Sequence, residues 1–431
     1  MKQILLFGAG KSATVLIDYL KQVAVANHWQ VLVADQDLAL AAEKTGWHEL
    51  VKPVGISISD AAARNGLIGQ SDVVISLLPP AMHLLVAVDC IAFKKPLLTA
   101  SYVGEDLRKL APAVQDAGVL FLCEMGLDPG IDHMSAMQLV HRIKNAGGVI
   151  DSFVSHCGGL VAPESNNNPW QYKISWNPRN IVMAGKAGAL YKKNKTIMRT
   201  GYEELFAHCS TVLVDGIGEL AYYPNRDSLA YMELYALEQA ETFIRTTLRY
   251  PDFCKGWQQV VALGLTNEND VIDTNGLSAA KFFEQAFEQK KYLPATDLAR
   301  RQFDFLGLDD PMPLNIGICN SATILQSILE KKWLLGEKDK DMVVMMHEIG
   351  YRVENNHKKT VSTLLVKGAD GLHTAMAKTV GLPLGIAATL LLEGKINTTG
   401  LQIPVLPEIY EPVLQRLAAY GIAFSEKTFN C

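Results

Sequence analysis

The sequence predicts an α/β protein: a Rossmann dinucleotide-binding domain followed by an α+β substrate domain with a helical insertion. Short apolar runs alternate with helical patterns over the first 123 positions, which is typical of a doubly wound parallel sheet. A glycine-rich stretch, GAGKSA, follows the first apolar run directly. After residue 146 the alternation gives way to strand-like stretches, a long polar loop and a mostly helical region.

The first strand and its loop carry the strongest local signal. QILLF (3–7) is an apolar run that suits a buried parallel strand, and the loop after it matches the G-x-G-x-x-G/A pattern in the required strand–turn–helix setting. Gly8 permits the tight turn, Gly10 leaves room for a pyrophosphate, and Ala13 lets the helix pack closely on the strand. The cofactor-binding loop is therefore expected to comprise Gly8, Gly10, Lys11, Ser12 and Ala13.

The second strand, QVLVA (30–34), ends at Asp35, about 20 residues beyond the glycines, where a ribose-binding acid belongs. A carboxylate there binds both ribose hydroxyls of NAD and repels the 2′-phosphate of NADP. Gln36 or Asp37 are alternatives that share this role. We therefore expect NAD, in preference to NADP, as the cofactor.

The rest of the first domain, over 1–123, continues the alternation. Strands are expected over 51–56, 72–80, 96–102 and 118–122, and helices from residue 59, over 82–93 and over 105–118. Ligands of open α/β sheets lie at the carboxyl ends of the strands. Ser76 and Leu77, near the end of the run 72–80, are therefore expected to border the cofactor.

The second domain is expected over 124–400, with a helical insertion over about 228–340. Within the insertion, LEQAETFIRTTL (237–248) has the clearest helical pattern. The segment 401–431 is expected to contain a helix, over 407–422, that returns to the first domain. Strand-like stretches cover 147–159, 219–225, 342–351 and 359–368, and 163–178 is a polar loop.

The stretch LCEMGLDPGIDHMS (122–135) lies where the two domains meet in the sequence. Asp128 and Pro129 have the pattern of a helix N-cap followed by the first helical position, and an apolar helical periodicity starts at Ile131. A helix N-terminus favours an anion, and a carboxylate beside it can hold a proton. Taken alone, an Asp-Pro-Gly motif is usually an ordinary helix cap.

Composition excludes several classes of function. Of the 431 residues, 49% are hydrophobic and 20% charged, which is the profile of a globular chain of two domains. A net charge of −5 without a basic stripe disfavours nucleic acids, and scattered cysteines without a C-x-x-C pair disfavour disulfides and structural zinc. No apolar run of about 18 residues is apparent. We expect a cytoplasmic homodimer with a small-molecule substrate and no nucleic-acid, membrane or metal partner.

A set of motifs, in order along the chain, resembles the glutamate-forming saccharopine dehydrogenases, also called saccharopine reductases. The resemblance is strong over about residues 3–270. It implies an enzyme that interconverts saccharopine with L-glutamate and 2-aminoadipate 6-semialdehyde, using a nicotinamide cofactor, in lysine metabolism. The motifs are VISLLP (74–79), TASY (99–102), EMGLDPGIDHM (124–134), CGGLVAPE (157–164), NPWQYKISWNP (168–178), YPNRDS (223–228) and TLRY (247–250).

The resemblance also implies roles for individual residues. Asp128, Cys157 and Tyr102 are expected to be catalytic, and Lys173 to contact the cofactor or the substrate. Substrate binding is expected from Ser101, Tyr102, Asp128, Arg226, Thr247 and Arg249. The arginines fit the chemistry, because saccharopine carries three carboxylates and a guanidinium binds a carboxylate with two parallel hydrogen bonds. Two departures are Val161, where the family usually has Pro, and Asp35–Gln36, which the resemblance associates with NAD.

The reaction needs a group that moves a proton near neutral pH. Asp128, Tyr102, Cys157 and Lys173 are candidates that the sequence does not rank, and His133 and His156 are alternatives. One rival function is a related imine reductase, such as a carboxynorspermidine dehydrogenase. Another is a non-catalytic cofactor-binding scaffold, which the polar motifs beyond residue 123 argue against.

Overall fold

A computed structural model describes residues 1–46 and 48–430. Trp47 and Cys431, the last of the seven cysteines, lie outside the described residues. The chain forms two compact units: unit 1 is Met1–Val149 with Leu364–Ser425, and unit 2 is Ile150–Thr363 with Glu426–Cys431. The domain boundaries expected at 123 and 400 both fall inside unit 1.

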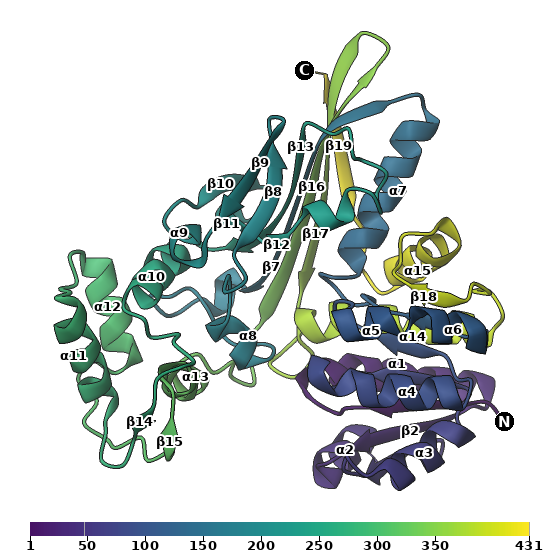
Figure 1. Cartoon of the computed structure of the whole chain (residues 1–431), viewed down its shortest axis with the longest axis horizontal. Helices are drawn as coiled ribbons and strands as arrows, with labels where there is room; N and C mark the ends of the chain where they lie inside the picture. The colour runs from purple at the N-terminus through teal and green to yellow at the C-terminus, as the bar shows by residue number, and fades with distance from the viewer. Residues whose placement is uncertain (47, 431) are drawn as a thin grey trace. The chain divides into compact units, whose positions relative to one another are not determined.

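Unit 1 is built on a seven-stranded sheet in which every neighbouring pair of strands is parallel (Figure 1). The order is β18-β6-β5-β4-β1-β2-β3, so the direction of winding reverses between β1 and β4. In such sheets a ligand binds at this switch point. The strands are β1 (Gln3–Phe7), β2 (Gln30–Asp35), β3 (Val51–Gly55), β4 (Val73–Ser76), β5 (Leu97–Thr99), β6 (Leu120–Leu122) and β18 (Gly400–Gln402). The predicted Rossmann architecture is confirmed.

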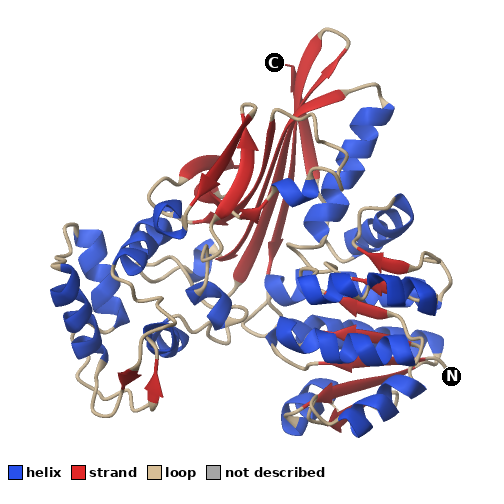
Figure 2. Cartoon of the chain, in the orientation of Figure 1, coloured by secondary structure: helices blue, strands red, loops and turns tan. Residues whose placement is uncertain are grey.

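Helices cover both faces of this sheet (Figure 2). Apolar residues of α3, α4, α5 and α6 pack on one face, against alternate residues of the strands such as Leu5 and Phe7. On the other side α14 packs along α1 and contacts β4 and β5. The helices are α1 (Thr14–Asn27), α2 (Leu38–Thr45), α3 (Ala61–Gln70), α4 (His83–Ala92), α5 (Glu105–Lys109), α6 (Ala111–Ala117), α7 (Ile131–Asn145), α14 (Ala375–Leu392) and α15 (Pro407–Ala419). The helix expected over 105–118 is interrupted at Leu110, two residues before Pro112.

Helix α14 belongs to unit 1 although it follows all of the long strands of unit 2 in sequence. Two glycines allow its close approach to α1: a Cβ at Gly381 would lie 2.9 Å from the Leu16 Cβ, and one at Gly385 would lie 2.6 Å from the Tyr19 ring. The helix is long and apolar enough to span a membrane, but 78% of it is buried inside the structure. It has the burial of a core helix, and the sequence analysis overlooked its apolar length.

Unit 2 contains a ten-stranded sheet, which includes the long red strands in the upper part of Figure 2. Its main path is β10-β11-β13-β7-β16-β17-β19, and β8, β9 and β12 join beside β13. Strands β13 and β7 are parallel, and β13 is antiparallel to β11. The strands are β7 (Val149–Val161), β8 (Ala189–Lys193), β9 (Thr196–Thr200), β10 (Ser210–Val214), β11 (Gly218–Pro224), β12 (Arg226–Asp227), β13 (Thr242–Arg249), β16 (Asp341–Val353), β17 (Asn356–Lys367) and β19 (Ser425–Asn430).

The helix expected over 237–248 is wrong, because residues 242–249 form strand β13. Its β-branched residues favour a strand, and its position between β11 and β7 supplies backbone partners on both sides. The remaining region is mainly helical and packs around a core rich in Trp, Tyr and Phe. It comprises α8 (Pro178–Val182), α9 (Tyr202–Leu205), α10 (Pro251–Ala262), α11 (Ala279–Lys290), α12 (Asp297–Leu306), α13 (Ser321–Lys332) and the short pair β14 (Ile272–Asp273) and β15 (Ile318–Cys319).

Candidate active site

The glycine loop in unit 1 has the geometry that a dinucleotide needs. Gly8 has φ +101°, and a Cβ there would lie 3.1 Å from the Leu77 carbonyl oxygen, so the turn requires glycine. A Cβ at Gly10 would meet nothing within 4 Å, which leaves open space on that side of the loop. A short 3₁₀ turn over Lys11–Ala13 then leads into α1, and Ala13 is buried. The loop and the helix start therefore fit a bound pyrophosphate.

Asp35 lies at the end of β2, as expected, but both of its carboxylate oxygens accept backbone N–H groups. Oδ2 accepts from Ala9 at 2.6 Å, and Oδ1 accepts from Asp37 at 2.9 Å. The carboxylate thereby connects the glycine loop to the turn after β2. Beside it, the Lys44 amine donates to the Gly10 carbonyl oxygen at 2.6 Å, so a positive charge also lies at this loop.

At the carboxyl edge of the sheet, one histidine joins two of the predicted residues. The Nδ1 atom of His83 is 2.8 Å from the Ser76 hydroxyl, and its Nε2 atom is 2.9 Å from the Ser101 hydroxyl. Ser76 is fully buried at the end of β4, whereas Ser101 is half-buried in the segment after β5. Burial lowers the pKa of His83 to about 4, so the imidazole is neutral at neutral pH.

Tyr102 and Asp128 are brought together, since the Tyr102 hydroxyl donates to Asp128 Oδ1 at 2.9 Å. The predicted N-cap role of Asp128 is wrong: α7 begins at Ile131 and its N-cap is Gly130. Gly130 has φ +147°, and a Cβ there would lie 2.1 Å from the Gly126 carbonyl oxygen. The chain turns too tightly at this glycine for the helix to start earlier. Asp128 lies two residues before this N-cap and accepts the hydrogen bond from Tyr102.

A buried cluster of Glu124, Asp132 and His133 holds the two segments that carry this pair. Glu124 accepts the Val103 N–H at 3.0 Å through Oε1, and its Oε2 lies 2.9 Å from His133 Nε2. Asp132 accepts the Gly130 N–H at 2.6 Å and lies 3.6 Å from His133 Nδ1. All three side chains are buried. Val103 follows Tyr102 directly and Gly130 is two residues beyond Asp128, so the cluster fixes the backbone on both sides of the pair.

In unit 2, three predicted residues share one face of the sheet. Cys157 on β7 and Thr247 on β13 are register partners in neighbouring parallel strands. Arg249 is two residues beyond Thr247, and alternate residues of a strand point to the same face. Cys157 and Arg249 are near enough to interact electrostatically. The structure thus brings together, in unit 2, the predicted catalytic residue Cys157 and two predicted substrate-binding residues, Thr247 and Arg249.

Arg249 is a buried cation with unused hydrogen-bonding capacity. It is 5% exposed, its Nη1 donates to the Leu248 carbonyl oxygen, and its Nε has no hydrogen-bond partner among the described residues. Its guanidinium lies over the rings of Tyr172 and Phe253, at 5.5 and 5.4 Å from their centres. Burial acts to lower the pKa of Arg249, but its neighbours, Tyr223 foremost, raise it on balance. Such a group has the chemistry to bind a carboxylate.

Two other predicted residues of unit 2 lie in different surroundings. Lys173 is nearly buried and donates to Asp339 Oδ2 at 2.6 Å. Burial is the largest influence on the pKa of Asp339 and acts to raise it, but the hydrogen bonds from Lys173 and the Gly336 N–H and the charge of Lys173 together lower it. Arg226 is exposed on β12, which pairs with β8, so it is not on the β7–β13 pair that carries Arg249.

His156, the other histidine considered, lies on the opposite face of β7 from Cys157. Its Nδ1 is 2.7 Å from the Thr246 hydroxyl and its Nε2 is 3.3 Å from Glu348 Oε2. Glu348 also pairs with Lys359. The hydrogen bond from His156 is the main reason that the pKa of Glu348 falls to about 2. These contacts account for His156 as a structural residue of the sheet.

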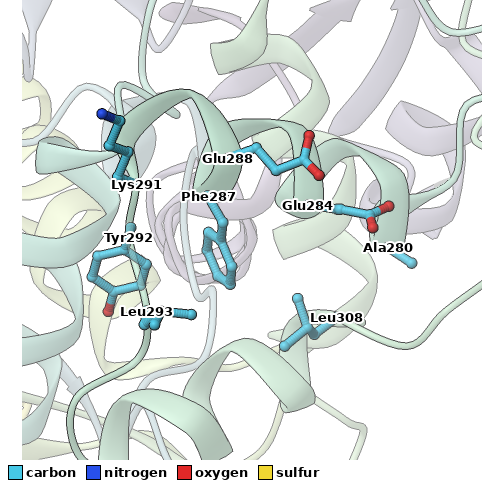
Figure 3. Close-up of a pocket in the computed structure, with 8 residues that line it drawn as sticks. All are labelled: Ala280, Glu284, Phe287, Glu288, Lys291, Tyr292, Leu293 and Leu308. Carbon is cyan, nitrogen blue, oxygen red and sulfur yellow. The ribbon is translucent and has the colours of Figure 1, made fainter.

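The pocket drawn in Figure 3 lies in the helical region of unit 2, at α11 and the loop after it. Its apolar wall includes Phe287, Tyr292 and Leu308, and Glu284 and Glu288 project from α11. None of the predicted site residues is among the described residues that line it. The candidate site therefore rests on the hydrogen-bonded groups described above.

The sequence analysis missed His83, Glu124 and Asp132. His83 had a usable signal, because it lies seven positions after Ser76, where the next helix starts at the carboxyl edge of the sheet. Glu124 and Asp132 stand inside the motif EMGLDPGIDHM, but their contacts are made with a segment some twenty residues earlier and with a local turn, which spacing alone does not reveal.

Two family models match the chain. One, described as "Saccharopine dehydrogenase C-terminal domain", matches residues 126–422, and the other, "Saccharopine dehydrogenase NADP binding domain", matches residues 4–122. The "Saccharopine dehydrogenase [NADP(+), L-glutamate-forming]" of Saccharomyces cerevisiae is 34% identical and aligns over 99% of both chains. The bovine "Alpha-aminoadipic semialdehyde synthase, mitochondrial" is 33% identical over 99% of this chain but 48% of its own length. This chain thus spans about half the length of such relatives.

Among solved structures, the apo saccharopine dehydrogenase (L-Glu forming) of Saccharomyces cerevisiae is similar over 100% of both chains, with a TM-score of 0.90 and 32% identity. The homospermidine synthase of Legionella pneumophila, solved with NAD, has a TM-score of 0.57 and 10% identity, and covers 99% of this chain and 91% of its own. At that identity the second likeness shows the fold alone.

The expectation of NAD as the preferred cofactor is wrong by these comparisons. The family model for the first domain is named for NADP, and the fungal relatives of 30–34% identity are named NADP(+)-dependent. The structure offers a physical reason why the spacing argument failed. Spacing located Asp35 correctly, but its carboxylate is engaged by the Ala9 and Asp37 N–H groups, and Lys44 adds a positive charge nearby.

Proposed function

The chain belongs to the saccharopine dehydrogenase family, and from that premise we propose that it oxidises the C–N bond of saccharopine. The proposed reaction converts saccharopine, NADP⁺ and water to L-glutamate, 2-aminoadipate 6-semialdehyde, NADPH and a proton. The observation that carries the proposal is Arg249: a buried guanidinium with an unpartnered Nε among the described residues is matched by a substrate rich in carboxylates.

The proposed roles follow from the contacts of each residue. NADP⁺, when bound, accepts a hydride from the carbon next to the secondary amine. That amine must lose a proton first, and Asp128, hydrogen-bonded to Tyr102, is the group we assign to hold it. The Tyr102 hydroxyl keeps Asp128 in one orientation. Water then adds to the imine carbon, and the carbinolamine separates into glutamate and the semialdehyde.

Arg249 and its neighbours are proposed to bind the substrate. The guanidinium binds one carboxylate through Nε and an Nη atom, and the rings of Tyr172 and Phe253 keep it away from water. Thr247, beside Cys157 on the adjacent strand, adds a hydroxyl on the same face. Arg226 is proposed for a second carboxylate. Lys173 is proposed to contact the cofactor or the substrate, with its amine held in place by the hydrogen bond to Asp339.

The test follows NADPH formation at 340 nm when the purified protein meets saccharopine and NADP⁺. Formation of glutamate and NADPH in equal amounts supports the proposal. Absence of turnover with saccharopine, when other amines joined to amino acids are oxidised, would overturn it. Cytoplasmic location and a homodimeric state remain predictions, and analytical ultracentrifugation tests the second.

A further inference from the structure

The hydrogen-bonded chain Ser76–His83–Ser101 has no assigned task in the proposed reaction. It runs from the fully buried end of β4, through the first residue of α4, to the half-buried segment after β5. His83 itself is 6% exposed. Ser101 is the member of this chain that has access to solvent, and it directly precedes Tyr102, the partner of Asp128.

We propose that His83 is a positioning residue: anchored by Ser76, it fixes the Ser101 hydroxyl in the orientation in which that hydroxyl binds the substrate. This rests on the proposed function, because it assigns Ser101 to saccharopine. The geometry favours this direction of action. Ser76 is fully buried and its hydroxyl lies 2.8 Å from His83 Nδ1, so it holds the imidazole in place.

The neutral state of the imidazole makes the arrangement specific. Burial keeps the pKa of His83 near 4, so at neutral pH one ring nitrogen donates and the other accepts. The two serines therefore have opposite roles toward the ring. If Nδ1 donates to Ser76, Nε2 accepts from Ser101, and the Ser101 oxygen then offers its lone pairs to the substrate. The other tautomer turns the Ser101 O–H toward the substrate.

Two substitutions separate the two halves of the chain. In His83→Gln the amide end reaches about as far as Nε2 and keeps a group beside Ser101, whereas in His83→Asn it reaches only as far as Nδ1 and keeps a group beside Ser76. We expect His83→Asn to raise the KM for saccharopine about tenfold, with the KM for NADP⁺ within twofold of wild type. His83→Gln is expected to recover most of the lost affinity.

Ser101→Ala provides the second arm. If His83 acts through Ser101, Ser101→Ala alone should raise the KM for saccharopine as much as His83→Asn does. The double variant should then be no worse than either single one. His141→Asn and His141→Gln are matched controls, because His141 on α7 also bonds a hydroxyl, that of Tyr410 at 2.8 Å, and lies outside the proposed machinery. Both controls should leave both KM values unchanged.

Equal losses in His83→Asn and His83→Gln, or additive losses in the double variant, would overturn the inference. An arm without substrate separates it from the proposed function. In ¹⁵N NMR of the free protein at pH 7, we expect a neutral His83 ring with a single tautomer, and a shifted Nε2 resonance in Ser101→Ala. If the wild type does not oxidise saccharopine, the proposed function fails while this resonance shift still tests the contact. A protonated ring, or an Nε2 resonance indifferent to Ser101, refutes the inference itself.

Discussion

The polar groups at the sheet edge of unit 1 and those on the β7–β13 face of unit 2 are stabilised in opposite ways. In unit 1 the groups satisfy one another: Ser101 bonds His83, Tyr102 bonds Asp128, and Glu124 bonds His133. In unit 2, Arg249 is buried, as Glu124 and His133 are, but its Nε has no hydrogen-bond partner among the described residues. A buried polar atom left unsatisfied costs about 1–3 kcal/mol, and more if charged.

This difference distinguishes residues that orient other side chains of the site from residues that have a hydrogen-bonding atom available for a ligand. A network whose members all hydrogen-bond one another fixes side-chain positions before a ligand binds. Less conformational entropy is then lost on binding. An incomplete one gains its missing hydrogen bonds from the ligand. The comparison therefore predicts that changes at Arg249 act mainly on substrate affinity, whereas changes in the Tyr102–Asp128 pair and in the Glu124–His133 contact act mainly on turnover.

Replacing Arg249 by Met should have the largest effect. Loss of two charge-assisted hydrogen bonds to a carboxylate corresponds to about 3 kcal/mol, or roughly a hundredfold rise in the KM for saccharopine. The folded protein should be no less stable, because an apolar side chain replaces a buried cation. Steady-state kinetics and thermal melting measure both. Arg300→Met, at an exposed site on α12, is the control. A variant that melts at a lower temperature than wild type while its KM for saccharopine stays normal would contradict the comparison.

Asp128→Asn should come next, and should act on kcat. The amide keeps the size of the side chain and a hydrogen bond with Tyr102 but cannot take a proton, so kcat should fall about 10²-fold. Tyr102→Phe should cost about tenfold, since it removes one neutral donor. Asp116→Asn, exposed on α6, controls for the change of charge. An effect of Asp128→Asn on KM alone would assign Asp128 to binding.

Glu124→Gln tests whether the buried cluster acts through the Tyr102–Asp128 pair. The amide oxygen can still accept the Val103 N–H, but the charged contact with His133 is lost, worth about 1.5 kcal/mol. We expect roughly a tenfold fall in kcat with the KM for saccharopine little changed. Glu105→Gln, at an exposed position of α5, should change neither quantity. A rise in KM equal to the fall in kcat would argue that the cluster has no orienting role.

The last prediction lies outside catalysis and concerns the pH dependence of stability in unit 2. The pKa of Glu348 is lowered to about 2, mainly by the hydrogen bond from His156, and Lys359 adds to this. Its stabilisation is fully present above about pH 4.5 and is lost as the pH falls toward 2, with a size on the order of 2 kcal/mol. In Glu348→Gln this loss should disappear. Hydrogen exchange of the β7 and β16 amides at pH 7, 4 and 3 measures it, with Glu288→Gln as the control.

Much of unit 1 follows from sequence because its signals are local. The run QILLF became β1, and the glycine loop has the predicted turn, with positive φ at Gly8. What failed depends on distant partners. Strand β18 and helix α14 complete the Rossmann unit from the far end of the chain, so no local pattern assigns them to it.

In the candidate site, too, local motifs were predicted and contacts with distant segments were not. The motif resemblance indicated Asp128, Tyr102, Cys157 and Arg249 as candidate site residues. It did not reveal that the N-cap of α7 is Gly130 and not Asp128, because that depends on the backbone at Gly130. Nor did it reveal the burial of Arg249, which is produced by rings contributed from other segments.

The packing of α14 against α1 through Gly381 and Gly385 also sets the order in which the protein is completed during synthesis. A ribosome adds about 5–20 residues per second, so the glycine loop and α1 emerge some tens of seconds before α14. Throughout that time the β4 and β5 strands of the nascent parallel sheet lack the helix that packs on them beside α1, while all of the long strands of unit 2 are translated. The nucleotide-binding unit is therefore not finished until α14 has been made, after the long strands of unit 2.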